Sequence, residues 1–318
     1  MADHSAIEWT DASWNPVRGC TKVSAGCKFC YAERFAERFR GVKGHPFEQG
    51  FDVRLVPEAL DLPLRWKKPR RVFVNSMSDL FHEDVPDRFI ADVFNVMKLA
   101  PEHTFQVLTK RPERMAAFVR PWTGATLPLP NVWLGVSVED QAAADERIPH
   151  LLATPAAVRF GSCEPLLGPV DLAAIIPGDE ASRLDALSGY YFCDGRNEPT
   201  PAPRLDWAIV GGESGPGARR CDVAWIRSLL KQCKAAGVPC FVKQLGAHVI
   251  TRNDDGLSGC EADDWQLDDP DGQVEEDLDG TRDGYQGAPV RVHLRDRKGG
   301  DPAEWPADLR VREYPKSN

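Results

Sequence analysis

The sequence contains no apolar run that approaches the roughly 18 to 20 residues needed to cross a bilayer. Its start, MADHSAIEWTD, lacks the basic region and apolar stretch of a secretory leader. These absences argue against a membrane protein and predict a cytoplasmic location. Cysteines in that compartment are mostly reduced, so a tight group among the nine present is expected to bind a metal rather than to form disulfides.

An excess of positive charge is also missing, because the formal net charge is −9. This argues against a protein that coats nucleic acid by electrostatic attraction alone and is compatible with a local basic surface. Much of the negative charge lies in residues 253–287, which are rich in Asp, Glu and Gly and poor in apolar residues. That composition is typical of a solvated loop or insertion.

No repeat of 20–50 residues and no heptad pattern is present. Instead, short apolar runs rich in β-branched residues recur from about residue 72 onward, and a helical pattern follows most of them. This alternation is typical of β/α units. The predicted strands are Arg71–Asn75, Thr104–Thr109, Val132–Val136, Ala157–Phe160, Trp207–Val210 and Cys240–Lys243, with a further strand just before Cys20.

Two intervening segments carry clear helical signals. Apolar residues recur at helical spacing from Val85 to Leu99, and Asp84 is the expected cap. A second helix is predicted from Asp222 to about Ala236, with Gly237 as its stop signal.

The strands are apolar without clean alternation, which suits parallel strands covered on both faces. The sequence therefore predicts an α/β fold, a partial (β/α) barrel of six or seven parallel strands over residues 1–250. Residues 176–205 interrupt the alternation as an insertion, and residues 251–318 form an acidic, loop-rich C-terminal extension. In such a fold, functional residues gather just after the carboxyl ends of the strands.

Three cysteines, Cys20, Cys27 and Cys30, lie within eleven residues in the spacing C-x6-C-x2-C, and no fourth cysteine is nearby. A structural zinc site normally closes four protein ligands around the ion, whereas three cysteines on a [4Fe–4S] cluster leave one iron open for another ligand. The pattern therefore favours a [4Fe–4S] cluster. A zinc site and unligated core cysteines are the alternatives.

Besides the cysteine motif, seven segments spread over about two-thirds of the chain form recognisable motifs. They are IEWTDASWNP, NSMSDLFHEDVP, FQVLTKRPERM, VWLGVSVEDQ, SCEPLLGPV, GGESGPGARR and FVKQLG. With them, the chain resembles the phage-associated three-Cys-motif proteins, a family similar to radical S-adenosylmethionine (SAM) enzymes. The resemblance implies a radical SAM barrel in which SAM chelates the open iron and is cleaved reductively to a 5′-deoxyadenosyl radical. It also implies a reductant such as flavodoxin or ferredoxin. The usual loop of that superfamily is C-x3-C-x2-C, so this one is three residues longer.

The resemblance assigns roles to residues beside the last cysteine and after the first predicted strand of the β/α series. The aromatic neighbours of that cysteine, Phe29 and Tyr31, are expected near the adenine of SAM. Ser76, Ser78 and Asp79 are candidates to bind the SAM amino group. The Gly-Gly-Glu triplet that is frequent there in the superfamily is missing.

Later strand ends supply the remaining candidates. Ser137 and Glu139 are expected to hold the ribose or the methionyl group, or else to cap the following helix. Glu164 and Glu213 are candidates to bind substrate or to transfer a proton, with solvated loop carboxylates as the alternative. Cys163 is a candidate hydrogen-atom donor, or else a small core residue.

The substrate prediction depends on cations. Lys110, Arg111 and Lys243 are suited to an anionic substrate, and Arg65–Arg71 concentrates cations around Trp66, as surfaces that contact phosphates and bases do. An ordinary solvated turn is the alternative. With the phage association, this favours nucleic acid or a nucleotide as the substrate of a repair or modifying enzyme.

Other functional classes stay open. In one alternative, zinc stabilises the amino-terminal loop of a non-catalytic module that binds nucleic acid or protein. An iron–sulfur electron carrier fits less well, because a carrier usually saturates its cluster with four protein ligands. A protein partner encoded by a neighbouring gene is also compatible with the sequence.

Overall fold

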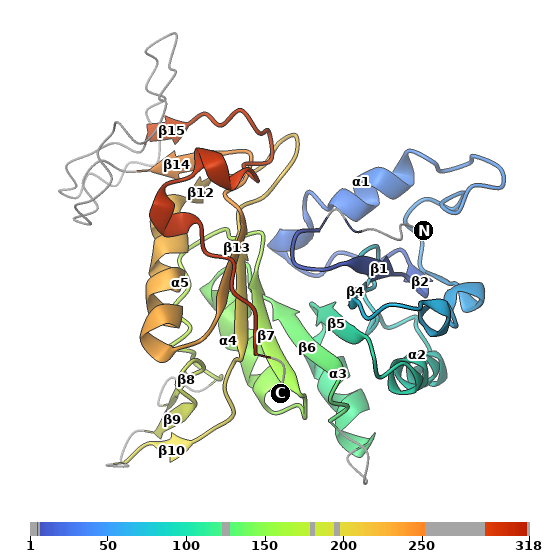
Figure 1. Ribbon diagram of the computed structural model, residues 1–318, viewed down its shortest axis with the longest axis horizontal. Helices are drawn as coiled ribbons and strands as arrows, with labels where there is room; N and C mark the ends of the chain where they lie inside the picture. Colours follow the sequence, from blue (N-terminus) through green and yellow to red (C-terminus); the bar gives the residue numbers. More distant parts are fainter. Residues whose placement is uncertain are drawn as a thin grey trace.

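A curled sheet of seven parallel strands forms the centre of the protein (Figure 1). The structure is a computed structural model that describes residues 5, 7–122, 128–178, 182–193, 198–251 and 290–316. The strand order is β1-β4-β5-β6-β7-β11-β13, and each neighbouring pair is parallel. The predicted partial barrel of six or seven parallel strands is therefore confirmed.

The six strands predicted with bounds lie close to their predicted positions, and the largest difference among them is at one carboxyl end. The strand predicted just before Cys20 is β2 (Val17–Arg18), which lies outside this sheet, whereas the sheet strand β1 ends earlier, at Trp14. The bounds are β1 (Ala12–Trp14), β4 (Arg71–Val74), β5 (Thr104–Thr109), β6 (Val132–Ser137), β7 (Val158–Cys163), β11 (Trp207–Gly211) and β13 (Cys240–Gln244). Strand β7 continues three residues beyond its predicted end, through Gly161 and Ser162. These residues have low strand propensity, but pairing with β11 on one side and β6 on the other holds them extended.

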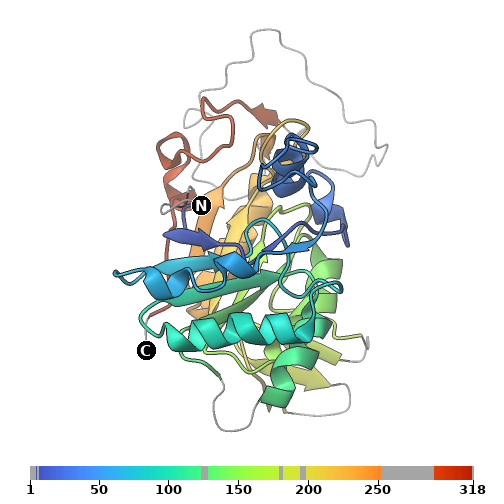
Figure 2. The same cartoon turned by 90° about the vertical axis from the view of Figure 1, so that its right-hand side faces the viewer.

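Four helices follow strands of the sheet: α2 (Asp87–Leu99), α3 (Pro112–Val119), α4 (Gln141–Leu152) and α5 (Val223–Ala236). Figure 2 shows α2 running along the sheet. Helix α5 has the predicted ends, because the Asp222 side chain accepts from Ala224 N and Gly237 adopts a left-handed φ of 66°. The predicted Asp84 cap of α2 is wrong, because Pro86 is extended and the helix begins after it.

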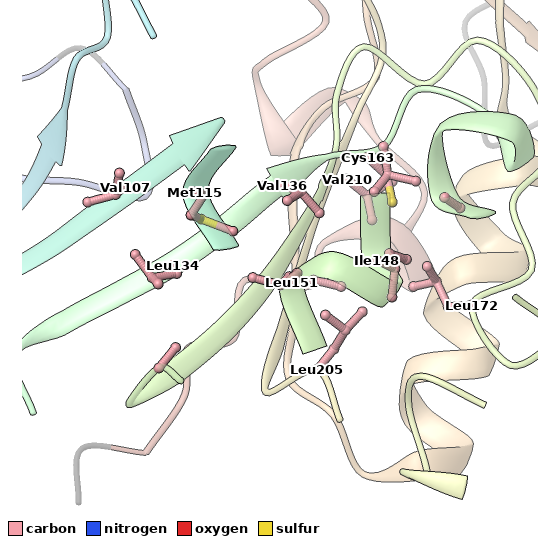
Figure 3. Close-up of a cluster of buried hydrophobic side chains, with 14 of the residues drawn as sticks. Val107, Met115, Leu134, Val136, Ile148, Leu151, Cys163, Leu172, Leu205 and Val210 are labelled. Atoms are coloured by element: carbon pink, nitrogen blue, oxygen red, sulfur yellow. The ribbon is translucent and has the colours of Figure 1, made fainter. Parts of the chain in front are cut away.

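The sheet has two buried faces. Its helix-covered outer face packs the main core, which includes Val107, Leu134, Val136 and Val210 (Figure 3). Its inner face is aromatic and carries Trp9, Phe73, Trp133, Phe160, Trp207, Ile209 and Phe241. Because side chains alternate along a strand, every second residue beyond these aromatics points toward the inner side of the carboxyl edge.

Residues 176–205, predicted to form an insertion, contain a three-stranded antiparallel sheet of β8 (Ser182–Asp185), β9 (Tyr190–Cys193) and β10 (Thr200–Pro201). Leu184, Leu187 and Leu205 are buried in the main core. The described part of the β7–β11 connection has no α-helix, so the insertion supplies this part of the core instead.

The end of the chain returns to the sheet. Strands β12 (Cys221–Asp222), β14 (Val249–Thr251) and β15 (Val290–Val292) form a separate small sheet. Beyond it, Val242 N donates to Val311 O at 2.8 Å and Glu313 N donates to Cys240 O at 2.9 Å. The C-terminal residues thus cover the free edge of β13. The acidic residues 253–287 lie outside the described residues.

Between β1 and β4 the chain forms β2 (Val17–Arg18), helix α1 (Tyr31–Glu37) and β3 (Arg54–Leu55), and β2 pairs with β3. Nowhere in the described ranges is a helix both long and apolar enough to span a membrane.

Candidate functional site

The cysteine loop, residues 19–31, is bound to the carboxyl ends of several strands. Gly19 N donates to Met77 O, beyond β4, at 3.1 Å. The Ser24 hydroxyl donates to Glu139, beyond β6, at 2.7 Å. The carbonyl of Ala25 accepts from Arg219, beyond β11, at 2.9 Å. The loop therefore lies across the edge of the sheet at which candidate site residues were predicted.

The three cysteines of this loop are partly buried and have free thiols. Burial raises the pKa of the Cys20 thiol, and the charges of Asp79 and Cys27 raise it further, whereas Arg111 opposes the shift. Across the described ranges, no three His, Cys, Asp or Glu side chains are grouped so that they could hold a metal ion.

Arg111 links the first cysteine to the sheet. Its Nη1 is 3.4 Å from Cys20 Sγ and 3.4 Å from Asp79 Oδ2, and its Nη2 donates to Thr21 Oγ1 at 2.8 Å. The Asp79 carboxylate also accepts from the Thr109 hydroxyl at 2.8 Å. Asp79, predicted to bind SAM, is therefore engaged in holding Arg111 and the end of β5.

Glu139 is the most deeply buried of the predicted site carboxylates, at 1% exposure. Besides the Ser24 hydroxyl, it contacts Arg147 Nη1 at 2.7 Å and Lys110 Nζ at 3.7 Å. Burial alone would raise the pKa of Glu139, but the charges of Lys110 and Arg147 and the Ser24 hydrogen bond lower it below its ordinary value. A methyl group on Gly26 would overlap the Glu139 side chain. Glu139 therefore fixes the middle of the cysteine loop.

Glu213 and Arg219 form a second anchor for this loop. Arg219 Nη2 and Nε donate to the two Glu213 carboxylate oxygens at 2.6 and 2.9 Å. Burial opposes ionisation of Glu213, yet Arg219 lowers its pKa below the ordinary value. The Arg219 guanidinium also lies 5.4 Å from the centre of the Phe29 ring. Phe29 is thus held against the segment beyond β11.

Glu164 and Lys243 form a third pair at the carboxyl edge, with 2.6 Å between Oε1 and Nζ. Gln244 Nε2 lies 3.3 Å from the same oxygen. These contacts hold the Glu164 carboxylate just beyond β7, against the carboxyl end of β13.

Cys163 lies on the opposite face of the sheet from Glu164. Its thiol is fully buried among Val136, Ile148 and Val210 in the outer core (Figure 3). Burial raises the pKa of this thiol, with a further contribution from the charge of Cys233. This position matches the core-residue alternative and places Cys163 away from the cysteine loop.

The side chains of Ser76 and Ser78 have hydrogen-bond partners within the protein, and Ser137 is buried. Ser76 Oγ is 3.3 Å from Asn15 Oδ1, and the Ser76 carbonyl accepts from the Tyr31 hydroxyl. The Ser78 hydroxyl donates to Val17 O at 2.7 Å. Ser137 is buried, and its carbonyl accepts from an Arg147 guanidinium nitrogen at 2.9 Å.

Sequence analysis did not identify Ser24, Gly26, Arg147 and Arg219. Ser24 is separated from Glu139 by 115 positions, and Ala25 is separated from Arg219 by 194. Residues so far apart in the sequence leave no local sequence pattern that predicts their contact. Arg219 lies within the GGESGPGARR segment, so that segment carried the only available signal.

The basic segment Arg65–Arg71 ends at the first residue of β4, at the amino edge of the sheet. Arg65 is paired with Asp61, and Arg71 is paired with Asp11 at 3.0 Å. The Arg70 guanidinium lies 5.0 Å from the Trp66 ring centre. This segment therefore does not adjoin the cysteine loop.

Comparison with known families shows a match over most of the chain. The model of a family described as "Protein of unknown function (DUF5131)" matches residues 4–288. No curated protein and no solved structure matches the chain. Because the family model covers most of the sequence, the protein belongs to the DUF5131 family.

Proposed function

We propose that the protein is a radical SAM enzyme that holds a [4Fe–4S] cluster through Cys20, Cys27 and Cys30. The observation that carries this proposal is the position of the cysteine loop across the carboxyl ends of β4, β6 and β11. Barrels of parallel strands place their chemistry at that edge.

The donor set matches such a cluster in residue type and sequence spacing, whereas the described side chains are not grouped around one metal position. Three free, partly buried thiols lie on one loop of eleven residues, and no fourth cysteine lies beside them in the sequence. Arg111 donates toward Cys20 Sγ, and hydrogen bonds to ligand sulfurs are one way in which proteins tune iron–sulfur clusters. A three-cysteine set leaves one iron open for SAM.

When bound, a cluster of this kind supplies the electron that cleaves SAM and yields a 5′-deoxyadenosyl radical. The chain's own residues would hold the loop and orient its ligands. Glu139 and the Glu213–Arg219 pair fix the loop, and Phe29 is positioned by Arg219 next to Cys30. Among the described residues, neither Glu164 nor Lys243 forms a hydrogen bond with the backbone of the cysteine loop. We therefore assign this pair to substrate binding.

Anaerobic purification with iron and sulfide analysis tests the cofactor. We expect about four iron and four sulfide per chain. After reduction, the electron paramagnetic resonance (EPR) signal should change when SAM is added. Stoichiometric zinc without iron after reconstitution would contradict the proposal and favour the zinc-stabilised binding module.

Cysteine variants test the ligand assignment. Cys20→Ala, Cys27→Ala and Cys30→Ala, singly and together, are expected to lose the cluster while the far-UV circular dichroism of the barrel is kept. Cys193→Ala is the matched control, because Cys193 is a partly buried free cysteine in β9 of the insertion. A full cluster in the triple variant would refute the assignment.

A further inference from the structure

One face of helix α1 combines exposed aromatic rings with arginines. Tyr31, Arg34, Phe35 and Arg38 are spaced i, i+3, i+4 and i+7, so they lie along one side of the helix and its end. Tyr31 is 56% exposed and Phe35 is 43% exposed. The buried alanines of α1 lie on its other side. Clusters of exposed aromatic side chains on a protein surface mark binding sites.

The exposed rings of this face are held in place. Phe35 packs against Phe39 and Phe47, with ring centres 5.2 and 5.7 Å away. The Tyr31 hydroxyl donates to the Ser76 carbonyl, so the ring is fixed at its far end. Rigid exposed rings lose little conformational entropy when a flat ligand stacks on them.

The same stretch of chain is strongly basic. Residues 18–43 contain seven Lys or Arg against two Glu, in a protein whose net charge is −9. Two of these cations, Lys22 and Arg40, are paired with carboxylates. In the part of the chain that the structure describes, Lys28, Arg38 and Lys43 are exposed and form no ion pair. They are available to a polyanion.

This basic aromatic surface adjoins the candidate site. Helix α1 begins directly after Cys30, and Arg34 Nη2 donates to Pro216 O, in the loop beyond β11, at 3.1 Å. In Figure 1, α1 lies far from the antiparallel sheet β8–β10, at the other end of the molecule. A polymer bound along α1 would pass next to the cysteine loop.

We infer that this surface binds single-stranded nucleic acid. Lys28, Arg38 and Lys43 contact its phosphates, and Tyr31 and Phe35 stack on its bases. An unpaired strand is favoured because a duplex hides the faces of its bases. The inference deepens the proposed function, since it names the substrate class of the same site. The chemical role of this surface rests on the proposed function, whereas its binding of a single strand does not.

Fluorescence anisotropy with labelled oligonucleotides of about 12 residues tests the inference. The probes are single-stranded DNA, single-stranded RNA, the DNA duplex and a poly-glutamate chain of matched charge. We expect a single strand to bind more tightly than the duplex. Phe35→Ala should weaken that binding about tenfold. Reversal of charge at Lys28, Arg38 and Lys43 should reduce the slope of log K against log salt by about two.

Lys67→Glu with Lys68→Glu is the matched control, because these lysines are exposed and lie at the opposite edge of the sheet. Those changes should leave affinity within about twofold, as expected for surface charges outside the interface. Equal or tighter binding of the duplex or of poly-glutamate would overturn the inference. Unchanged affinity in both the Phe35→Ala and the charge-reversed variants would also overturn it.

The cluster and the binding surface are tested separately. If single strands do not bind while SAM still changes the EPR signal, the inference fails and the proposed function stands. If single strands bind as expected while no iron is incorporated, the surface stands and the radical SAM proposal fails. Far-UV circular dichroism of each variant checks that it is folded.

Discussion

At the scale of single residues, Glu139 links more parts of the site than any other predicted carboxylate. Its oxygens contact a hydroxyl of the cysteine loop, a lysine after β5 and an arginine of α4. Glu139 and Arg147 are both almost fully buried. Removing one member of a buried pair leaves the other charge without compensation, which costs more than the pair itself contributes.

Glu139→Gln is therefore expected to lower the free energy of unfolding by about 3 kcal/mol. The amide keeps the shape of the side chain but leaves the buried Arg147 guanidinium with only the largely exposed Glu146, 3.8 Å away, as an ion-pair partner among the described residues. Urea unfolding followed by circular dichroism measures the loss. Glu113→Gln is the control, because the Glu113 side chain is 82% exposed and its change should cost less than about 0.5 kcal/mol. Equal stability of the two variants would contradict this role.

The same residue predicts a pH dependence. The pKa of Glu139 in the folded protein lies below its ordinary value of 4.5. Its ionised form therefore contributes stability above pH 4.5, and this contribution is lost as pH falls through the lower folded pKa. The difference in unfolding free energy between wild type and Glu139→Gln should shrink below pH 4.5. A difference that stays constant down to pH 3 would show that Glu139 does not titrate in this way.

At the scale of elements, the cysteine loop depends on one close approach to the sheet. Gly26 packs against Glu139, and a Cβ at this position would overlap the Glu139 side chain. The barrel strands do not depend on this contact, so Gly26→Ala should displace the loop while the sheet stays folded. Under the proposed function, iron incorporation should fall several-fold in this variant.

Gly168→Ala is the control for that experiment, because its added Cβ would lie 3.8 Å from the nearest atom, an ordinary contact. Iron content measured after identical reconstitution, with circular dichroism as the check of folding, compares the two variants. Full iron content in Gly26→Ala would show that the loop tolerates the displacement.

The elements themselves were largely predictable from the sequence. Apolar runs such as WAIV and CFVK gave strands near their observed bounds, and Asp222 and Gly237 marked both ends of α5. The sequence also placed Glu139, Glu164 and Glu213 at strand ends. Their partners were not predictable, because Arg147, Lys243 and Arg219 meet them only after the sheet curls. The face of the sheet on which Cys163 lies was also not predictable, because it depends on how far β7 continues.

At the scale of the whole molecule, aromatic side chains fill the amino end of the half-barrel. The polar groups of the candidate site lie at its carboxyl end. Trp207 is in ring contact with Trp9, Trp133 and Phe241 on the inner face. Tyr314, from the end of the chain, joins this cluster with its ring centre 5.5 Å from that of Trp207. Residues of both chain ends thus stabilise the inner face.

The returning C-terminal segment is anchored by Trp305, which is 1% exposed. The Trp305 indole donates to Gly299 O at 3.1 Å, and the Arg312 guanidinium lies 5.6 Å from its ring centre. Truncating a buried tryptophan removes apolar contacts and leaves a cavity. Trp305→Ala should therefore lower the free energy of unfolding by about 3 to 5 kcal/mol.

Leu64→Ala is the control for Trp305→Ala, because Leu64 is 44% exposed and its change should cost less than about 1 kcal/mol. Hydrogen exchange then shows where stability is lost. If residues 311–313 protect the free edge of β13, the amide of Val242 should exchange faster in Trp305→Ala, because it donates to Val311 O. Equal protection of Val242 in both variants would mean that the segment stays on the sheet without its tryptophan anchor.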